Sequence, residues 1–143
     1  MYDVLYFAVS PSADLYNSFY LSRYLQIVEV QHPEKKFRVM NLHLEAYSKE
    51  NRELHLIKVQ DRIRDFEVDI SGGDFNGAMT LLPETEQAGF KMLAAPQATF
   101  PSASPTQVLD GFILNQNHWR LESIQTQMTG LISDHFPVVI QLV

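Results

Sequence analysis

The fold is decided by Val68-Asp69-Ile70-Ser71-Gly72-Gly73-Asp74-Phe75-Asn76, where an apolar run meets two glycines and then an Asp and an Asn. We expect residues 68–71 to form a short strand and the glycines to lead it into a turn. Because side chains alternate along an extended backbone, Asp74 and Asn76 share one face and Phe75 turns back towards the core. Taken alone, the segment is also explained by a Gly-Asp turn without any function.

A predicted β-hairpin precedes this segment and carries a second group of polar residues. Its strands are Tyr24–Gln31 and Phe37–Leu44, with a turn at His32-Pro33-Glu34-Lys35 between them. In the second strand Asn41 and His43 point one way and alternate with apolar residues that point the other. One face of this strand is therefore predicted to join the core, and the other can carry the polar side chains of a functional site.

The rest of the chain is predicted to contain helices and strands of one domain, residues 1–143. Ser48 is a plausible N-cap for a helix to about Phe66, in which apolar residues recur at helical spacing. The predicted fold class is α/β in an α+β-like arrangement, with helices on one side of a mixed, largely antiparallel sheet. The remaining predicted elements are strands at Val4–Val9, Val108–Leu114, Arg120–Met128 and Pro137–Val143, a helix at Pro83–Leu93 and a loop at Ala94–Gln107.

Composition limits the classes of function. The 143 residues fit one domain, and 11 basic against 17 acidic residues give a net charge of −6, which argues against nonspecific DNA coating. The chain has no cysteine, so a bound metal would be held by oxygen and imidazole ligands, which favours Mg²⁺, Mn²⁺ or Ca²⁺. No apolar run is long enough for a membrane span or a signal peptide, and a cytoplasmic location is expected.

Two further polar positions lie near the C-terminal strands. Ser133-Asp134-His135 precedes the last predicted strand and places an acid and an imidazole on a loop at a sheet edge. Asp110 falls on the apolar face of its strand, where an ionised carboxylate is costly unless it is paired. We expect His135 to donate a hydrogen bond to Asp110, because such a pair fixes the imidazole. A solvated Asp134 and an ordinary surface His135 are the simpler alternatives, and Asp110 could instead be a strand-edge acid bonded to backbone amides.

Taken in order, these motifs and the strand Val39-Met40-Asn41-Leu42-His43-Leu44 resemble the endonuclease/exonuclease/phosphatase superfamily, the DNase I-like phosphoesterases. The resemblance covers about residues 20–143. It includes the strand entry Leu21-Ser22-Arg23, Arg52 and Gln60 on the predicted helix, and the terminal segment Ser133-Asp134-His135-Phe136-Pro137. It implies a DNase I-like sandwich, of which this chain would hold about half of the usual four layers. It also implies a hydrolase that acts on phosphoester bonds with Mg²⁺ or Mn²⁺.

The resemblance implies a role for each polar position. Asp74 would orient or deprotonate the attacking water, and Asp110 would orient His135. A divalent cation and imidazole or amide donors would neutralise the charge that builds up on the phosphate oxygens. The implied roles are catalysis for Asp74, Asn76, His43, Asp110 and His135, phosphate binding for Asn41, Asn76, His43 and His135, and metal binding for Asp74 and Asp134.

The resemblance fails for the N-terminal part of the family's fold, which supplies an Asn and the Glu that anchors Mg²⁺. Glu29 is the nearest carboxylate, but it lies on the strand just before His43, so no metal role is assigned to it. Half of a sandwich would leave one sheet face open, and an apolar patch of that kind is rarely exposed in a soluble monomer. We therefore expect a homo-oligomer, or a separate N-terminal half that covers this face.

The sequence leaves three hypotheses for function. The first is a metal-dependent phosphoesterase that is truncated and weak or inactive by itself. Its candidate substrates are small phosphodiesters, sugar or inositol phosphates and phospholipid head groups, since the acidic composition disfavours long nucleic acid. The second hypothesis is a catalytically inactive interaction module that keeps half of the fold. The third is an unrelated α/β binding domain.

Overall fold

The computed structural model describes residues 2–6, 23–130 and 132–143, which form a six-stranded sheet and a two-stranded ribbon. The strands are β1 Tyr2–Tyr6, β2 Tyr24–Gln31, β3 Lys36–His43, β4 Ile70–Asp74, β5 Phe90–Ala94, β6 Asp110–Asn115, β7 Leu121–Thr126 and β8 Val138–Leu142. The order across the larger sheet is β1-β2-β3-β4-β6-β5, and β7 pairs with β8. Neighbouring strands are antiparallel except for β3 and β4, which confirms a mixed, largely antiparallel sheet.

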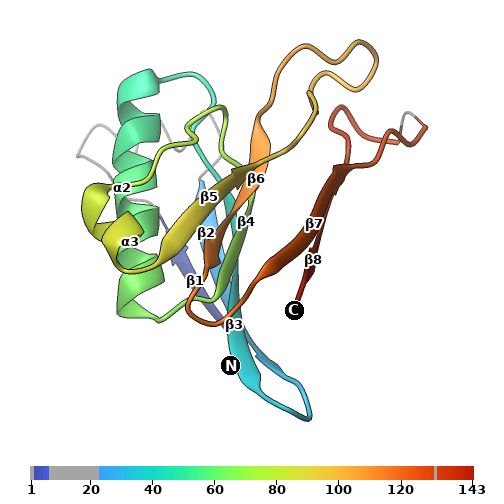
Figure 1. Cartoon of the computed structure of the whole chain (residues 1–143). Helices are drawn as coiled ribbons and strands as arrows, with labels where there is room; N and C mark the ends of the chain where they lie inside the picture. Colours follow the sequence, from blue (N-terminus) through green and yellow to red (C-terminus); the bar gives the residue numbers. More distant parts are fainter. Residues whose placement is uncertain (1, 7–22, 131) are drawn as a thin grey trace.

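Helices cover one face of this sheet, and the β7–β8 ribbon lies beyond the other (Figure 1). The helices in the described residues are α2 (Lys49–Asp65) and α3 (Pro83–Gln87). Helix α2 begins as predicted, because the Ser48 side chain accepts a hydrogen bond from the Asn51 N–H at 3.2 Å. None of the helices in these ranges has the length and apolarity that crossing a membrane requires.

The hydrophobic core lies between α2 and the sheet. Leu56, Val59 and Ile63 recur at helical spacing on α2 and are almost completely buried. They belong to one cluster with Met40 and Leu42, the inward side chains of β3. The polar positions that alternate with these two residues are therefore left on the face that α2 does not cover.

The parallel pair β3 and β4 places polar residues at one edge of the sheet. Because the two strands run in the same direction, their carboxyl ends meet there, and the register sets His43 beside Asp74. The antiparallel strand β6 begins at the same edge, with Asp110 opposite Asp74. Three neighbouring strands thus present polar side chains side by side. Phe75, the residue that follows β4, is completely buried, as predicted.

A glycine allows close contact between β3 and β4 at this edge. Gly73 has a φ of +147°, and a Cβ at this position would lie 2.0 Å from the Leu42 carbonyl oxygen. The glycines lie inside β4, which corrects the prediction that the strand ends at Ser71. The backbone of Gly72 and Gly73 pairs with the neighbouring strands on both sides, so the chain turns only after Asp74.

The predicted helix at Pro83–Leu93 is wrong in its second half. Helix α3 ends at Gln87, and Gly89, with a φ of +89°, turns the chain away from the helix axis. Residues 90–94 then form the edge strand β5, antiparallel to β6. This pairing is made with a strand later in the chain, and a local helical pattern contains no information about it.

The other predicted elements form with small shifts of their ends. Strand β2 has the predicted bounds, and the bounds of α2, β3, β6, β7 and β8 lie within two residues of the predicted ones. The first predicted strand, Val4–Val9, corresponds to β1, and its residues 7–9 lie outside the described residues. Element ends are the part of a fold that local patterns define least.

Candidate active site

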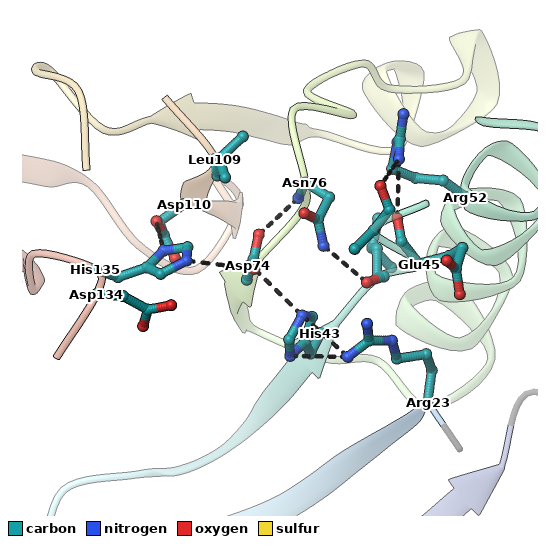
Figure 2. A network of polar contacts seen from close by, with 12 residues as sticks. Arg23, His43, Glu45, Arg52, Asp74, Asn76, Leu109, Asp110, Asp134 and His135 are labelled. Carbon is teal, nitrogen blue, oxygen red and sulfur yellow. Dashed lines mark hydrogen bonds and ion pairs between the residues drawn. The ribbon is translucent and has the colours of Figure 1, made fainter. Parts of the chain in front are cut away.

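Polar side chains gather where β3 and β4 end and β6 begins (Figure 2). Asp74 is at the centre of the group, with its Oδ2 3.3 Å from His43 Nε2 and 3.9 Å from His135 Nε2. Asp110 lies beside Asp74 on the next strand, and His135 comes from the loop before β8. Asn76 follows Asp74 in the turn after β4. The structure thus brings together five predicted site residues from four separate segments of the chain.

The predicted hydrogen bond between His135 and Asp110 is present. His135 Nδ1 lies 2.8 Å from Asp110 Oδ2, and an ionised carboxylate only accepts, so Nδ1 is the nitrogen that carries the donated proton. The Thr99 hydroxyl donates to the same carboxylate oxygen. The Thr99 carbonyl also accepts from the Phe136 N–H at 2.9 Å. Thr99 therefore holds Asp110 and the loop that carries His135 in one arrangement.

The charges around His135 favour its protonated form. Burial by itself lowers the pKa of His135, but the hydrogen bond to Asp110 and the negative charges of Asp110, Asp74 and Asp134 outweigh burial, so the pKa lies above the ordinary 6.5. Because Nδ1 faces Asp110, the Nε2 side of the charged ring faces Asp74. An imidazolium in this position can neutralise charge on a bound anion.

Asp74 has the environment of a proton acceptor. Burial raises the pKa of the Asp74 carboxyl, while a hydrogen bond from the Asn76 backbone N–H and the nearby His43 act in the opposite direction. Asp74 Oδ1 accepts that N–H at 2.7 Å, which leaves Oδ2 facing the two histidines. A carboxylate with a raised pKa is a stronger base than an exposed one, as general base catalysis near neutral pH requires.

His43 is in a different electrostatic environment from His135. Partial burial and the Arg23 guanidinium lower the pKa of His43 below 6.5, against the effect of Asp74. Arg23 Nη1 lies 3.2 Å from His43 Nε2 and 3.4 Å from Nδ1. The neutral ring is therefore favoured, and the guanidinium supplies a permanent positive charge on this side of Asp74.

Asn76 is held in a turn conformation that suits a ligand contact. Its φ of +49° lies in the left-handed region, which Asn adopts more readily than most residues. Asn76 Nδ2 donates to the Leu44 carbonyl at 2.9 Å. An amide nitrogen carries two hydrogens, so one N–H remains for a phosphate oxygen.

Two predicted site residues lie at the margin of the group. Asn41 is exposed on the same face as His43, and no polar contact in the described part of the chain joins it to Asp74. Asp134 is also exposed, with its Oδ1 3.4 Å from Ser133 Oγ, and its charge acts on His135. The phosphate role of Asn41 and the metal role of Asp134 stay predictions.

These residues supply only part of the ligands that a divalent metal ion needs. In the described ranges, no three Asp, Glu or His side chains lie together closely enough to ligate one ion. Asp74 and Asp134 supply carboxylate oxygens, whereas Mg²⁺ takes ~6 oxygen ligands in octahedral geometry. The metal site implied by the sequence resemblance is therefore incomplete in the described part of the chain.

The site lies between two cavities. One, of about 320 Å³, lies between the sheet edge and the loop before β8, and its lining includes Asp110 and His135. The other, of about 430 Å³, lies on the α2 side, and its lining includes Asn76 and Arg52. Figure 2 shows these two pairs of residues on opposite sides of Asp74. Cavities of this size accommodate parts of a ligand that extend beyond a phosphate group.

Two residues of the site have no role assigned to them by the sequence analysis. Arg23 belongs to the segment Leu21-Ser22-Arg23, which is part of the family resemblance, and Thr99 lies in a proline-rich loop that also contains Thr106. Neither residue has a fixed spacing to the motifs, because each reaches the site through the tertiary fold. Thr99 is completely buried and Arg23 is half-buried, and nothing in the local sequence of either residue indicates its contact in the site.

Solved structures of other proteins resemble this one. A mannosyl-6-phosphatase from Bacteroides thetaiotaomicron is 18% identical at a TM-score of 0.68, with 86% of this chain and 58% of that chain covered. TDP2 of D. rerio, complexed with a single-strand DNA product, is 17% identical at 0.70, with 100% and 67% covered. An endonuclease/exonuclease/phosphatase from Bacteroides vulgatus is 15% identical at 0.69, with 100% and 64% covered. The chain shares their fold.

The endonuclease/exonuclease/phosphatase fold, DNase I-like, is thus confirmed for this chain. No protein-family model matches the sequence, and no curated protein matches it either. The chain spans 58% of the length of the mannosyl-6-phosphatase. This coverage agrees with the prediction that the chain holds about half of the usual four-layer domain.

Proposed function

We propose that this chain carries the water-activating and phosphate-binding side of a phosphoesterase with the endonuclease/exonuclease/phosphatase fold. The observation that supports the proposal most is the position of Asp74, a carboxylate only 15% exposed that lies between two histidines. One of these, His135, is held by Asp110 and favoured in its charged form. A base next to a cationic hydrogen-bond donor is what attack of water on a phosphoester needs.

Each residue has a defined part in the proposed reaction. Asp74 accepts a proton from the water whose oxygen bonds to phosphorus. The bond from phosphorus to the alcohol oxygen breaks, and the leaving alkoxide takes a proton from solvent water. His135 and the second amide N–H of Asn76 donate hydrogen bonds to the phosphate oxygens as negative charge builds up. His43 contacts the phosphate from the opposite side, and the Arg23 guanidinium adds positive charge there.

The proposal includes dependence on Mg²⁺ or Mn²⁺, which would neutralise charge on the phosphate. Asp74 and Asp134 are the ligands that we assign to it in this chain. Because the described residues do not complete the ligand set, the remaining oxygens have to come from water or from outside these residues. We therefore expect hydrolysis by this chain alone to be well below the ~10 s⁻¹ typical of enzymes.

The proposed substrates are small. Small phosphodiesters, sugar or inositol phosphates and phospholipid head groups remain the candidates. The net charge of −6 disfavours long nucleic acid, because a polyanion is repelled by an acidic protein.

The test is hydrolysis of bis(4-nitrophenyl) phosphate with Mg²⁺ or Mn²⁺ by the whole chain and by Asp74→Asn. We expect the substitution to lower the rate by about 10²–10⁴-fold, the usual contribution of a general base. Asp69→Asn is the control, because Asp69 is a buried carboxylate just before the same strand, at its other end. An Asp74→Asn rate equal to that of the control would contradict the proposal.

An inactive interaction module is the second candidate, and the incomplete set of metal ligands favours it. It predicts no hydrolysis above buffer with either metal ion in the same assay. Both candidates leave exposed apolar side chains such as Val28 (37%) and Val139 (44%) on the strands. We propose that a second copy or a separate N-terminal half covers them.

A further inference from the structure

The larger of the two cavities beside the site has no role in the proposed reaction. It has a volume of about 430 Å³ and lies between α2 and the segment 77–82, which follows the site turn. We name it the α2 cavity. Asn76 belongs both to its lining and to the site, since the Asn76 backbone N–H bonds to Asp74 at 2.7 Å. Asn76 is therefore the residue at which the α2 cavity meets the site.

The shape of the α2 cavity is fixed by a buried glutamine. Gln60, on α2, is only 1% exposed. Its Oε1 accepts from the Leu82 N–H at 2.6 Å, and its Nε2 donates to the Thr80 carbonyl at 3.3 Å. Both ends of the amide thus bind the segment that forms the opposite wall. Because these hydrogen bonds hold the two walls together, the cavity has the preformed character of a ligand-binding site.

The polar side chains around the cavity already bond to the protein. Arg52 Nη1 donates to the carbonyls of Glu45 at 3.1 Å and Ala46 at 2.9 Å. Lys49 Nζ lies 3.7 Å from Glu53 Oε1, four residues along the helix. The side-chain amide of Gln60 bonds to Leu82 and Thr80. Arg52 and Gln60 are thus held by the protein, whereas Lys49 and Glu53 are exposed on the helix surface, 83% and 62%.

The rest of the lining is mainly apolar. Besides Gly77 and Thr80, it comes from α2 and from the facing segment and consists of Leu56, Ile57, Ala78, Leu81 and Leu82. Ile57 is 41% exposed, which is high for a large aliphatic side chain. An apolar ligand group that covers this side chain would remove its surface from water, which is favourable.

We infer that the α2 cavity binds an apolar substituent on the alcohol oxygen of a phosphoester whose phosphate lies at Asp74 and Asn76. This inference rests on the proposed function and names its substrate class, an ester of an alcohol with an alkyl or other apolar group. It favours an apolar group over a hydroxyl-rich sugar, because both of the facing walls present aliphatic side chains. The site and the α2 cavity then recognise two parts of one ligand.

The experiment compares binding of inorganic phosphate, methyl phosphate and hexyl phosphate to the whole chain, by calorimetry and by amide chemical shifts. We expect hexyl phosphate to bind about tenfold tighter than methyl phosphate. That ratio corresponds to ~1.4 kcal/mol, less than full burial of two methylene groups supplies. The amides of segment 77–82 should shift with hexyl phosphate only.

Two variants of α2 separate the cavity from the helix surface. Ile57→Asn makes the lining polar without changing charge, and we expect it to reduce the hexyl to methyl ratio to about twofold or less, since a polar side chain no longer offers apolar contact. Leu54→Asn is the matched control, because Leu54 is 39% exposed on the same helix and does not line the cavity. This control should keep the tenfold ratio.

The outcomes distinguish the inference from the proposed function. Tight binding of hexyl phosphate that Ile57→Asn weakens selectively supports the inference. Equal binding of the methyl and hexyl esters, or an equal loss in both variants, overturns it and leaves the phosphate site standing. Failure of all three phosphates to bind would contradict the proposed function, and the inference with it.

Discussion

The chain contains two short histidine–aspartate pairs at opposite ends of the same two strands. His135 Nδ1 lies 2.8 Å from Asp110 Oδ2, and His118 Nδ1 lies 2.7 Å from Asp69 Oδ1. Asp110 begins β6 at the edge where β4 ends. Asp69 comes just before β4, and His118 lies in the turn after β6. As isolated pairs they are nearly the same.

The surroundings of the two pairs differ. The second Asp69 oxygen accepts the Arg38 backbone N–H at 2.8 Å. The nearby Glu29 forms ion pairs with two basic side chains. It lies 3.6 Å from Arg38 and 3.7 Å from Lys36. The His118 side chain is 56% exposed, against 25% for His135.

The difference shows that a short histidine–aspartate hydrogen bond does not by itself make a site. The Asp110 pair faces a third group, Asp74, whose pKa burial raises and whose remaining oxygen faces two histidines. The Asp69 pair faces a backbone N–H and completed ion pairs. The Asp110 pair is thus next to a further titratable carboxylate, whereas the Asp69 pair connects two elements of the fold.

The largest expected difference is in hydrolysis. His135→Gln should lower the rate on bis(4-nitrophenyl) phosphate by about 10²–10⁴-fold, because it removes the cation that faces the phosphate. His118→Gln should leave the rate within a fewfold of the parent chain. Rates measured side by side with Mg²⁺ or Mn²⁺ check this. Equal losses in the two variants would mean that the comparison between the pairs is wrong.

The next expected effect is on stability, and it concerns the two members of the Asp69–His118 pair. Asp69→Ala should lower the free energy of unfolding by about 1–3 kcal/mol, because it leaves the Arg38 N–H without its acceptor in a partly buried place. His118→Ala should cost less, about 1 kcal/mol or below, since its exposed ring contributes a solvent-screened pair. Urea unfolding of both variants measures the difference. A larger loss in His118→Ala would show that the ring, and not the carboxylate, holds this end of the sheet.

Much of the fold follows from local patterns in the sequence. Ser48 and the apolar spacing on α2 define the helix, and the alternation around Met40 defines β3, because capping and periodicity act within a few residues. Strand β5 could not be predicted in this way. Its residues follow a helical turn, and only the pairing with β6 makes them a strand.

The residues of the candidate site that belong to sequence motifs could be predicted. Asp74 and His135 stand in distinctive segments, and an acid on an apolar strand face points to a partner for Asp110. The assignments of Arg23 and Thr99 needed the structure, because their contacts join segments that are distant in the chain. The same is true of the contrast with His118, whose sequence context gives no sign of its pair with Asp69.

The central claim is that Asp74, Asp110 and His135 act as one electrostatic unit, and an NMR titration of the histidine rings tests it most directly. A pKa of His135 above 6.5 means that its protonated ring stabilises the fold below about pH 6.5, and that this contribution is lost as the pH rises through the folded value. We expect His135 to titrate above 6.5 and His43 below it. Asp110→Asn should lower the pKa of His135, because it removes a charge and weakens the hydrogen bond. Two rings that titrate together near 6.5, unchanged by Asp110→Asn, would contradict the claim.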